Sequence, residues 1–503
     1  MRSDAPRSSD APSALVLALA ACAVLALYAL TARAVLDQDP FVMAEVARMV
    51  LRGQRLYGEV WDNKAPLTIL FYAIPEWLAP RSYLAIQLFA GLCAIVQAWT
   101  ALAYTRGHAW WPRAAAASLV LLGPLSRFEY AWASSEDAAN LFAVVALFAS
   151  LRIYLDPVRS RLDALAAGAA VVLAFHARQS SLLFGAIPVA ALGLGPLDLG
   201  KRVRGLAALA AGGVLAWLAV LGVVWAIGSV PGYIDTVFLG PRKYSGTPSQ
   251  WVALFGFARN DALMLVLPAS LIALVGRPRD LALSAVIAAT GVASIAAPMR
   301  AHLHYWEQIL PVASAMVFLA LREQGERAAR IGAASLIAFL GLNAGWTAVK
   351  CVLRPTTRDY YAVAEDLRAL ARPEATLFVV GRDSGPVYFA ASRPHANEFF
   401  WDYYLFGVPK LLPTPLPRVL EQYEQRPPDL LVVDEDVLGE IRSRPAGELN
   451  AAWELVRRLV ASGRYDEAGR HPGLEAGSPT TSWRYYRLRA QGAAPSAAPG
   501  ASG

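Results

Sequence analysis

The sequence is short of cysteine, histidine and charge. Its 503 residues include three Cys and six His, and Asp, Glu, Lys and Arg together make only 17%. So few Cys and His argue against a zinc module or a disulfide scaffold. A soluble domain of this size would carry about 25% charged residues. Because 56% of the residues are hydrophobic, the chain holds more apolar surface than one aqueous core needs, which argues against a single soluble enzyme domain.

Glycine is not organised into a phosphate-binding loop, since no Gly-rich nucleotide motif occurs anywhere in the chain. The 37 Gly and 33 Pro are also too scattered for a collagen-like or disordered chain. A net charge of +7 would suit a nucleic-acid partner if the basic residues formed a patch. They fall instead between apolar runs, which indicates a membrane topology signal.

Long apolar runs dominate the first two thirds of the chain. Residues 13–36 contain one charge, Arg33, and are long enough to cross about 30 Å of hydrocarbon. The stretch Leu19-Ala20-Ala21-Cys22 looks like a lipoprotein cleavage box, but the run continues past Cys22, so we predict an uncleaved signal anchor. Further runs occur at 83–104, 114–133, 137–155, 162–177, 180–197, 205–229, 261–276, 280–298, 305–321 and 331–349. We therefore expect an α-helical polytopic membrane protein with about 11 transmembrane helices.

Basic residues fall in alternate loops if the N-terminal tail, 1–12, is cytoplasmic. This predicts a multi-pass protein of the inner or plasma membrane. The transmembrane domain would span 13–350, with a long first outer loop at 37–82. Within that loop, 66–82 is apolar but short and contains Trp and Tyr, which is typical of an interfacial helix. Asp163 and Glu307 are the charges that fit the apolar runs least well.

Charge rises and long apolar runs stop after residue 350. Helical periodicity at 358–372 and 450–462, with short apolar stretches at 375–381, 429–434 and 482–488, predicts helices and strands. We expect a small extracytoplasmic α/β domain at 351–489. Residues 490–503, rich in Ala, Pro, Gly and Ser, are predicted to be a disordered tail.

The predicted outer loops collect unusual polar residues. A charge at bilayer depth costs about 2.5–3.5 kcal/mol, so such residues suggest a site. Carboxylates can accept a proton or hold a metal, and Lys, Arg and His can hold a phosphate. A sugar donor linked to a lipid phosphate would suit a site that contains both carboxylates and basic side chains. It would also explain why the chain has no Gly-rich nucleotide-binding motif. The candidates are Asp39, Tyr57, Lys64, Glu136, Asp137, Arg178, Gln179, His304, Tyr305 and Gln308.

Several of these residues stand in motifs that resemble the GT-C glycosyltransferases, in the branch of protein O-mannosyltransferases and the lipid A aminoarabinose transferase. The resembling stretches are Asp39 to Gly53 with its Ala44-Glu45 pair, Lys64-Ala65-Pro66-Leu67, Ser135-Glu136-Asp137, His176-Ala177-Arg178-Gln179 and His304-Tyr305 with Pro311. Their order and common side carry the resemblance over about 13–350, which would then be the catalytic domain. One departure is Pro40, because the family often has Glu directly after the first Asp.

The resemblance implies transfer of a monosaccharide from a polyprenyl-phosphate donor to an acceptor hydroxyl outside the membrane, with inversion. Asp39 matches the catalytic Asp and would be the general base. Lys64, Arg178 and His304 would act as cations that neutralise the phosphate. Glu136, Asp137 and Gln179 would help to bind the substrates, and Tyr57, Tyr305 and Gln308 would line the sugar site. The acceptor would be an envelope polysaccharide, lipid or protein. The resemblance fixes no cofactor with certainty, and a divalent metal is an option that is not favoured.

Simpler interpretations stay open for the same residues. Asp39 could only cap the helix that follows it, and Lys64 could be an ordinary interface residue. Glu136 and Asp137 could cap the next span, Arg178 could neutralise Asp163 or Glu307, and His302 with His304 could bind a metal if further ligands were present.

Two other classes of function remain. The first is a transporter or flippase of lipid-linked sugars, which would usually show internal repeats, and none is found in this sequence. The second is a non-catalytic envelope assembly protein, whose outer domain would bind a partner.

Overall fold

The computed structural model describes residues 14–35, 37–127, 133–156, 158, 160–244, 250, 252–253, 256, 262–298, 302–381, 383–406, 409–445, 449–471 and 482–489. The predicted tails, 1–12 and 490–503, lie outside the described residues. The chain divides into two compact units. The helical unit takes Met1–Leu36, Lys64–Ala226 and Ser245–Arg354, and the α/β unit takes Asp37–Asn63, Ile227–Tyr244 and Pro355–Gly503.

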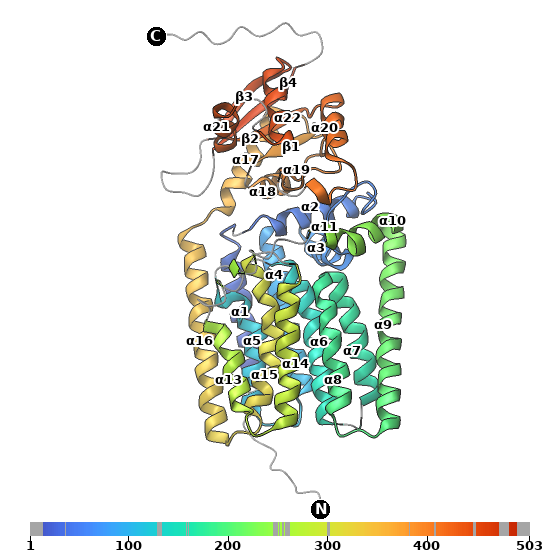
Figure 1. The fold of residues 1–503 in the computed structure, drawn as a ribbon. Coiled ribbons are helices and arrows are strands. Elements are labelled where there is room, and N and C mark those ends of the chain that lie inside the picture. The colour runs from blue at the N-terminus through green and yellow to red at the C-terminus, as the bar shows by residue number, and fades with distance from the viewer. Residues whose placement is uncertain are drawn as a thin grey trace, which may run out of the picture. The chain divides into compact units, whose positions relative to one another are not determined.

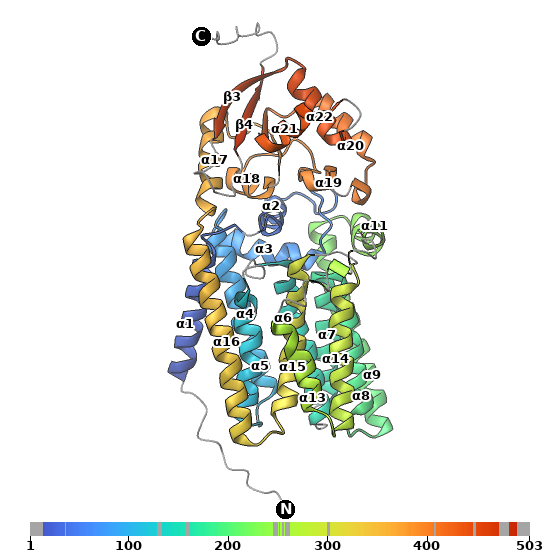
Figure 2. The same cartoon turned by 60° about the vertical axis from the view of Figure 1, so that its left-hand side comes forward.

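The helical unit is built from α-helices that run mostly side by side, with short 3-10 turns between some of them (Figures 1 and 2). Its α-helices are α1 (Ala14–Thr31), α3 (Pro66–Leu78), α4 (Tyr83–Tyr104), α5 (Trp110–Leu122), α6 (Ser135–Leu155), α7 (Ser160–Ala177), α8 (Ala186–Leu194), α9 (Leu199–Ile227), α13 (Val266–Ala273), α14 (Pro278–Ala296), α15 (Ile309–Leu321) and α16 (Glu326–Leu353). The 3-10 turns are η1 (Pro124–Ser126), η3 (Gln179–Gly185), η5 (Ala262–Leu265) and η6 (Leu303–Gln308).

Among the described residues, six helices are long and apolar enough to cross a membrane: α4, α6, α7, α9, α14 and α16. They correspond to six of the eleven predicted runs. The other runs form shorter or broken helices, since η3, η5 and η6 each interrupt regular α-helix within an apolar stretch. The count of eleven spans therefore stays a prediction. The short run at 66–82 does form a helix, α3, which starts at Pro66, while its place at a membrane surface stays a prediction.

Helix α6 is the most enclosed of the six, with 72% of its apolar window buried. Close packing elsewhere in the unit depends on glycine. A Cβ added to Gly168 of α7 would lie 1.9 Å from the carbonyl oxygen of Leu209 in α9, and one on Gly212 would lie 2.0 Å from that of Leu165. Small residues at helix contacts let backbones approach in this way. The two helices could not pack so closely with any larger residue at these positions.

Helices α9 and α16 are enclosed least, with 28% of each window buried. Their uncovered surface is apolar, and Trp225 and Leu342 are 77% and 76% exposed. Side chains of this kind suit contact with lipid rather than with water.

Charged groups at the Leu155 end of α6 are paired. Arg152 lies 3.5 Å from Asp163. The Tyr154 hydroxyl donates to Asp280 at 2.6 Å, and Arg322 approaches the same carboxylate at 3.2 Å. Asp163 therefore has Arg152 as its partner, and the sequence-based alternative that Arg178 neutralises it is wrong.

The α/β unit contains a four-stranded sheet in the order β1-β2-β4-β3. The strands are β1 (Leu377–Val380), β2 (Leu430–Asp434), β3 (Tyr465–His471) and β4 (Trp483–Leu488). β1 and β2 are parallel and fully buried, which suits their apolar sequences. β4 pairs antiparallel with both β2 and β3. The predicted strands at 375–381, 429–434 and 482–488 are confirmed, whereas the polar edge strand β3 was not predicted.

The helices of this unit are α2 (Asp39–Leu51), α10 (Val230–Tyr233), α11 (Gly240–Tyr244), α17 (Thr357–Leu370), α18 (Ser384–Ala391), α19 (Asp402–Phe406), α20 (Leu416–Gln425), α21 (Glu435–Ser443) and α22 (Ala451–Ala461), with the π-turn η4 (Ile234–Leu239) and the 3-10 turn η7 (Pro409–Leu411). The predicted helices at 358–372 and 450–462 correspond to α17 and α22.

Residues 37–63 pack in the α/β unit, although the sequence analysis grouped them with the transmembrane domain. Phe41 of α2 meets Phe389 of α18 with ring centroids 5.4 Å apart. The Leu56 amide donates to the Ile227 carbonyl at 3.0 Å. Trp61 Nε1 donates to Thr236 Oγ1 at 3.2 Å. These contacts tie the predicted first outer loop to 227–244 and to the C-terminal fold.

Candidate functional site

Four of the predicted site residues meet inside the helical unit. Glu136 is fully buried and forms an ion pair with Arg178, which is 8% exposed. His304 Nε2 lies 3.8 Å from Glu136 Oε1, the oxygen that Arg178 also contacts. The Arg178 guanidinium stacks 4.0 Å from the ring centroid of Tyr305. We call Glu136, Arg178, His304 and Tyr305 the Arg178 cluster.

Local backbone signals explain why α6 presents Glu136 here. A capping box begins the helix: Ser134 Oγ accepts from the Glu136 amide at 3.1 Å, and the Ser134 amide donates to Asp137 Oδ2 at 2.9 Å. Such a box fixes the first helical turn. Asp137 therefore does cap the span, as the simpler interpretation held, while the side chain of Glu136 pairs with Arg178.

Arg178 lies where α7 ends and η3 begins. Its backbone is extended, with φ −151° and ψ 119°, so the chain leaves the helix at this residue. Gln179 is the first residue of η3 and is half-buried.

Glu307 joins this region although it was not assigned to the site from the sequence. Ser134 Oγ donates to Glu307 Oε2 at 2.6 Å, and Asn140 Nδ2 donates to the Glu307 carbonyl at 3.1 Å. Ser134 therefore contacts both acids, because its amide donates to Asp137 Oδ2 at 2.9 Å and its hydroxyl donates to Glu307. The sequence signal for this residue is a single acid at the start of an apolar run, where a charge is costly and therefore suggests a functional role.

Gln308 is fully buried and is held by serines from two neighbouring elements. Its Nε2 donates to Ser181 Oγ at 3.0 Å, and Ser294 Oγ donates to its Oε1 at 2.9 Å. Both ends of the amide therefore have partners, which links η6 to η3 and α14. This residue fixes the turn that carries His304 and Tyr305.

The surroundings of His304 oppose the positive charge that the sequence analysis expects there. Burial lowers the pKa of His304 well below its ordinary value, and His302, Arg178 and Lys64 lower it further. These surroundings favour the neutral imidazole, which can donate or accept a hydrogen bond. Lys64, half-buried before α3, and Arg178 supply the positive charge near it. Among the described residues, no group of three or more His, Cys, Asp or Glu could hold a metal ion.

Asp39 belongs to the α/β unit. Gln38 occupies the N-cap of α2, and Asp39 is the first helical residue, followed by Pro40. The Asp39 amide donates to Asp37 Oδ1 at 2.8 Å, and Trp401 Nε1 donates to Gln38 Oε1 at 3.3 Å. Because Gln38 holds the N-cap position, the interpretation of Asp39 as the N-cap is wrong. Its half-buried carboxylate stands in the first turn, where the helix dipole favours negative charge.

Tyr57 lies on the same loop, in a strained backbone conformation with φ 63°. Its ring is 6% exposed and lies 6.4 Å from that of Tyr233. Burial raises the pKa of Tyr57 well above its ordinary value, and Asp62 and Tyr233 add to the rise. The loop ends where the Tyr404 hydroxyl lies 2.9 Å from Asp62 Oδ2. Tyr57 is thus a packed residue that shapes the loop carrying Asp39.

No protein-family model matches the chain, and no curated protein matches it in sequence. Solved structures do share its fold. ArnT from Cupriavidus metallidurans in the apo state is 13% identical, with a TM-score of 0.60 over 94% of this chain and 98% of ArnT. ArnT bound to undecaprenyl phosphate is 12% identical, with a TM-score of 0.58 and the same coverage. The arabinofuranosyltransferase AftD from Mycobacteria is 15% identical, with a TM-score of 0.48 over 96% of this chain and 42% of AftD.

The chain therefore has the fold of ArnT over nearly its whole length. ArnT is the lipid A aminoarabinose transferase whose branch the sequence motifs resemble, so the predicted GT-C-like fold is confirmed. Six helices among the described residues are long and apolar enough to cross a membrane, and with this fold the chain is an integral membrane protein.

Proposed function

We propose that this chain is a glycosyltransferase that moves a monosaccharide from a polyprenyl-phosphate donor to an acceptor hydroxyl on an envelope polysaccharide, lipid or protein. The reaction takes place on the outer face of the cytoplasmic membrane, with the N-terminus cytoplasmic and the α/β unit extracytoplasmic. The observation that carries the proposal is the buried, preformed Arg178 cluster on the fold of ArnT. One ArnT structure holds undecaprenyl phosphate, which supports a lipid-phosphate partner.

In the proposed reaction the acceptor oxygen attacks the anomeric carbon while the bond from that carbon to the phosphate oxygen breaks. Asp39 takes the acceptor proton, for which its carboxylate must come within about 2.6–3.2 Å of the hydroxyl oxygen. The electron pair of the broken bond leaves with the polyprenyl phosphate. A single displacement of this kind inverts the configuration at the anomeric carbon.

The leaving phosphate needs positive charge rather than a proton. Arg178 and Lys64 supply it, and the Arg178 guanidinium is already oriented by Glu136 and Tyr305. A preorganised cation stabilises developing charge without reorganising during the reaction. His304 contributes a neutral hydrogen-bonding ring. Glu136, Asp137, Gln179 and Tyr305 would contact the substrates. Gln308 and Tyr57 would line the sugar site from behind, by holding the turn and the loop on which they lie.

Asp39→Asn tests the proposed base, and Asp37→Asn is its matched control. Asn at position 39 cannot take the proton, so the transfer rate should fall about 10²–10⁴-fold. Asn at position 37 keeps an oxygen that can accept from the Asp39 amide, so its rate should stay within a few-fold of wild type. The measurement is product formation from polyprenyl-phosphate sugars by the purified chain in nanodiscs. Full activity of Asp39→Asn, or equal loss in both variants, would contradict the role of Asp39.

Envelope composition tests the class of function. Cells without the protein should accumulate a polyprenyl-phosphate sugar and should carry an envelope glycan, lipid or protein that lacks one sugar, as measured by mass spectrometry. A flippase would move the donor across vesicle membranes without forming a glycosidic bond. An assembly protein would do neither, so the two results together separate the three classes.

A further inference from the structure

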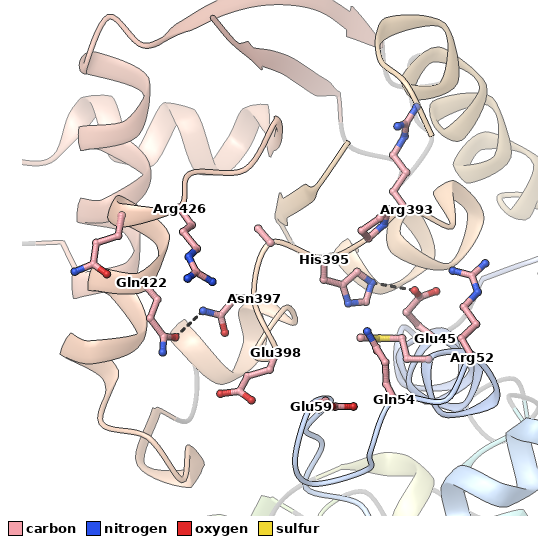
Figure 3. A pocket seen from close by; sticks show the side chains of 14 residues that line it. Glu45, Arg52, Gln54, Glu59, Arg393, His395, Asn397, Glu398, Gln422 and Arg426 are labelled. Carbon is pink, nitrogen blue, oxygen red and sulfur yellow. Dashed lines mark hydrogen bonds and ion pairs between the residues drawn. The ribbon is translucent and has the colours of Figure 1, made fainter. Parts of the chain in front are cut away.

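The α/β unit contains a cavity of about 620 Å³ that the proposed reaction does not yet use (Figure 3). Its size lies within the range of small-molecule sites, about 300–1,000 Å³. Three stretches line it: α2 with the loop after it, the segment 393–398, and the end of α20. All of them belong to the α/β unit.

The lining is polar and its formal charges balance. Three glutamates, three arginines and four side-chain amides line it. The Arg393 guanidinium donates to the carbonyls of Leu367 and Ala371, and Glu45 is paired with Arg48, so two carboxylates and two guanidinium groups remain. A phosphate or another anion would be bound by an excess of positive charge, and a lipid tail by an apolar lining. Carboxylates, guanidinium groups and amides together offer donors and acceptors at fixed angles. This is the chemistry that recognises a neutral ligand rich in hydroxyl groups.

Charged groups along the α2 side of the cavity are bound to one another. Glu45 is buried and contacts both Arg48 and His395. The distance between His395 Nε2 and Glu45 Oε1 is 2.9 Å. Arg48 Nη1 also donates to the Phe389 carbonyl at 3.3 Å. Burial would raise the pKa of Glu45, but Arg48 and the His395 hydrogen bond outweigh burial and lower it. Glu45 therefore stays ionised and joins α2 to the 393–398 segment.

Other side chains around the cavity are open to a ligand. Asn397 Nδ2 donates to Gln422 Oε1 at 2.8 Å, which sets the position of both amides (Figure 3). Gln54, Glu398 and Arg426 all line the cavity, and their side chains make no hydrogen bond to other described residues. An amide, a carboxylate and a guanidinium are thus available from its three sides.

We propose that this cavity binds an uncharged saccharide, and that it holds a sugar unit of the acceptor; the second clause rests on the proposed function. Helix α2 carries both Asp39 and Glu45, and six residues of helix advance about 9 Å along its axis. The assigned base and the cavity wall are therefore fixed to one helix. A saccharide held in the cavity belongs to a molecule large enough to offer a second hydroxyl elsewhere, as an envelope glycan does.

Binding to a glycan array tests the proposal with the full chain in lipid nanodiscs, without sugar-based detergents. We expect binding to neutral oligosaccharides in the absence of donor, and weaker binding to sulfated or phosphorylated ones. Arg426→Ala and Glu398→Ala should each weaken binding at least tenfold. Arg418→Ala is the matched control, since Arg418 is exposed on α20 and does not line the cavity. Unchanged thermal unfolding of each variant checks the fold.

The outcomes separate this proposal from the proposed function. Asp39→Asn should bind neutral glycans like wild type even when it transfers no sugar. A chain that transfers sugar but binds no neutral glycan, or that loses binding equally in Arg418→Ala, overturns the cavity proposal and leaves the enzyme standing. A chain that binds glycans through Glu398 and Arg426 but forms no glycosidic bond supports the cavity and overturns the enzyme.

Discussion

Replacing Glu136 by Gln should destabilise the helical unit more than any surface charge change does. Glu136 is fully buried, and its partner Arg178 has 9% of its side chain exposed. Removing one partner of a buried ion pair costs about 3–5 kcal/mol, because the other charge is left uncompensated. Gln keeps an oxygen for the hydrogen bond from Ser135 Oγ, which is 2.9 Å long in wild type. The loss should therefore report the ion pair rather than that hydrogen bond.

A double-mutant cycle isolates the pair. Arg178→Met keeps an apolar stem against Tyr305 but removes the charge, so Glu136→Gln with Arg178→Met leaves no charge unpaired at this contact. The double variant should be more stable than the sum of the two single losses, by about 0.5–3 kcal/mol. The assay is unfolding by SDS in mixed micelles, followed by the fluorescence of the 14 Trp residues.

A surface pair provides the control. Glu440 and Arg444 lie 3.4 Å apart with 44% and 52% of their side chains exposed. Pairs of this kind contribute about 0–1 kcal/mol, so Glu440→Gln should leave the SDS midpoint nearly unchanged. If Glu136→Gln behaved like Glu440→Gln, or if the two losses in the cycle simply added, Glu136 would not be what holds Arg178 in place.

Two further predictions concern packing and pH. Gly168→Ala should cost about 1–3 kcal/mol by overpacking, because its Cβ would lie 1.9 Å from the Leu209 carbonyl oxygen; Gly222→Ala on α9, with open space around it, should be neutral or stabilising in the same SDS titration. The pKa of His395 is lowered by burial despite its bond to Glu45, and that of Glu45 is lowered by Arg48 and His395. Both groups stabilise the fold at pH values above their ordinary pKa. This stability is lost as pH falls below that pKa, which is about 6.5 for His395 and about 4.5 for Glu45. His395→Gln should therefore flatten the fall in melting temperature between pH 7 and pH 5, and an unchanged slope would contradict this.

Apolar patterning predicts the long elements well and the interrupted ones poorly. Helices α4, α6, α7, α9, α14 and α16 and strands β1, β2 and β4 all follow runs visible in the sequence. The runs at 180–197, 261–276 and 305–321 contain 3-10 turns, which hydropathy does not detect because it reports composition and not backbone geometry. Strand β3 is polar along most of its length and is specified by its pairing with β4. Its place at the sheet edge leaves little burial pattern to predict it.

Hydropathy also does not predict which segments belong to each of the two units. Residues 37–63 follow one apolar run and precede another, so the sequence places them in a loop of the membrane domain. Their assignment to the α/β unit depends on contacts made by distant aromatic residues. Trp401 bonds to Gln38 at one end of the loop, and Tyr404 bonds to Asp62 at the other. Such pairings between distant segments leave no periodic signal.

The acid that pairs with Arg178 can be predicted from the sequence only in part. Asp163 lies in the first turn of α7 and Arg178 directly follows its last, so fifteen residues at 1.5 Å each separate them by about 22 Å. This distance is beyond the reach of any side chain, and helix bounds alone would have removed Asp163 from consideration. The choice between Glu136 and Glu307 depends instead on contacts among α6, η3 and η6, which come from distant parts of the sequence. At the start of α6 the capping box binds the Asp137 carboxylate to the Ser134 amide, while the Glu136 side chain pairs with Arg178.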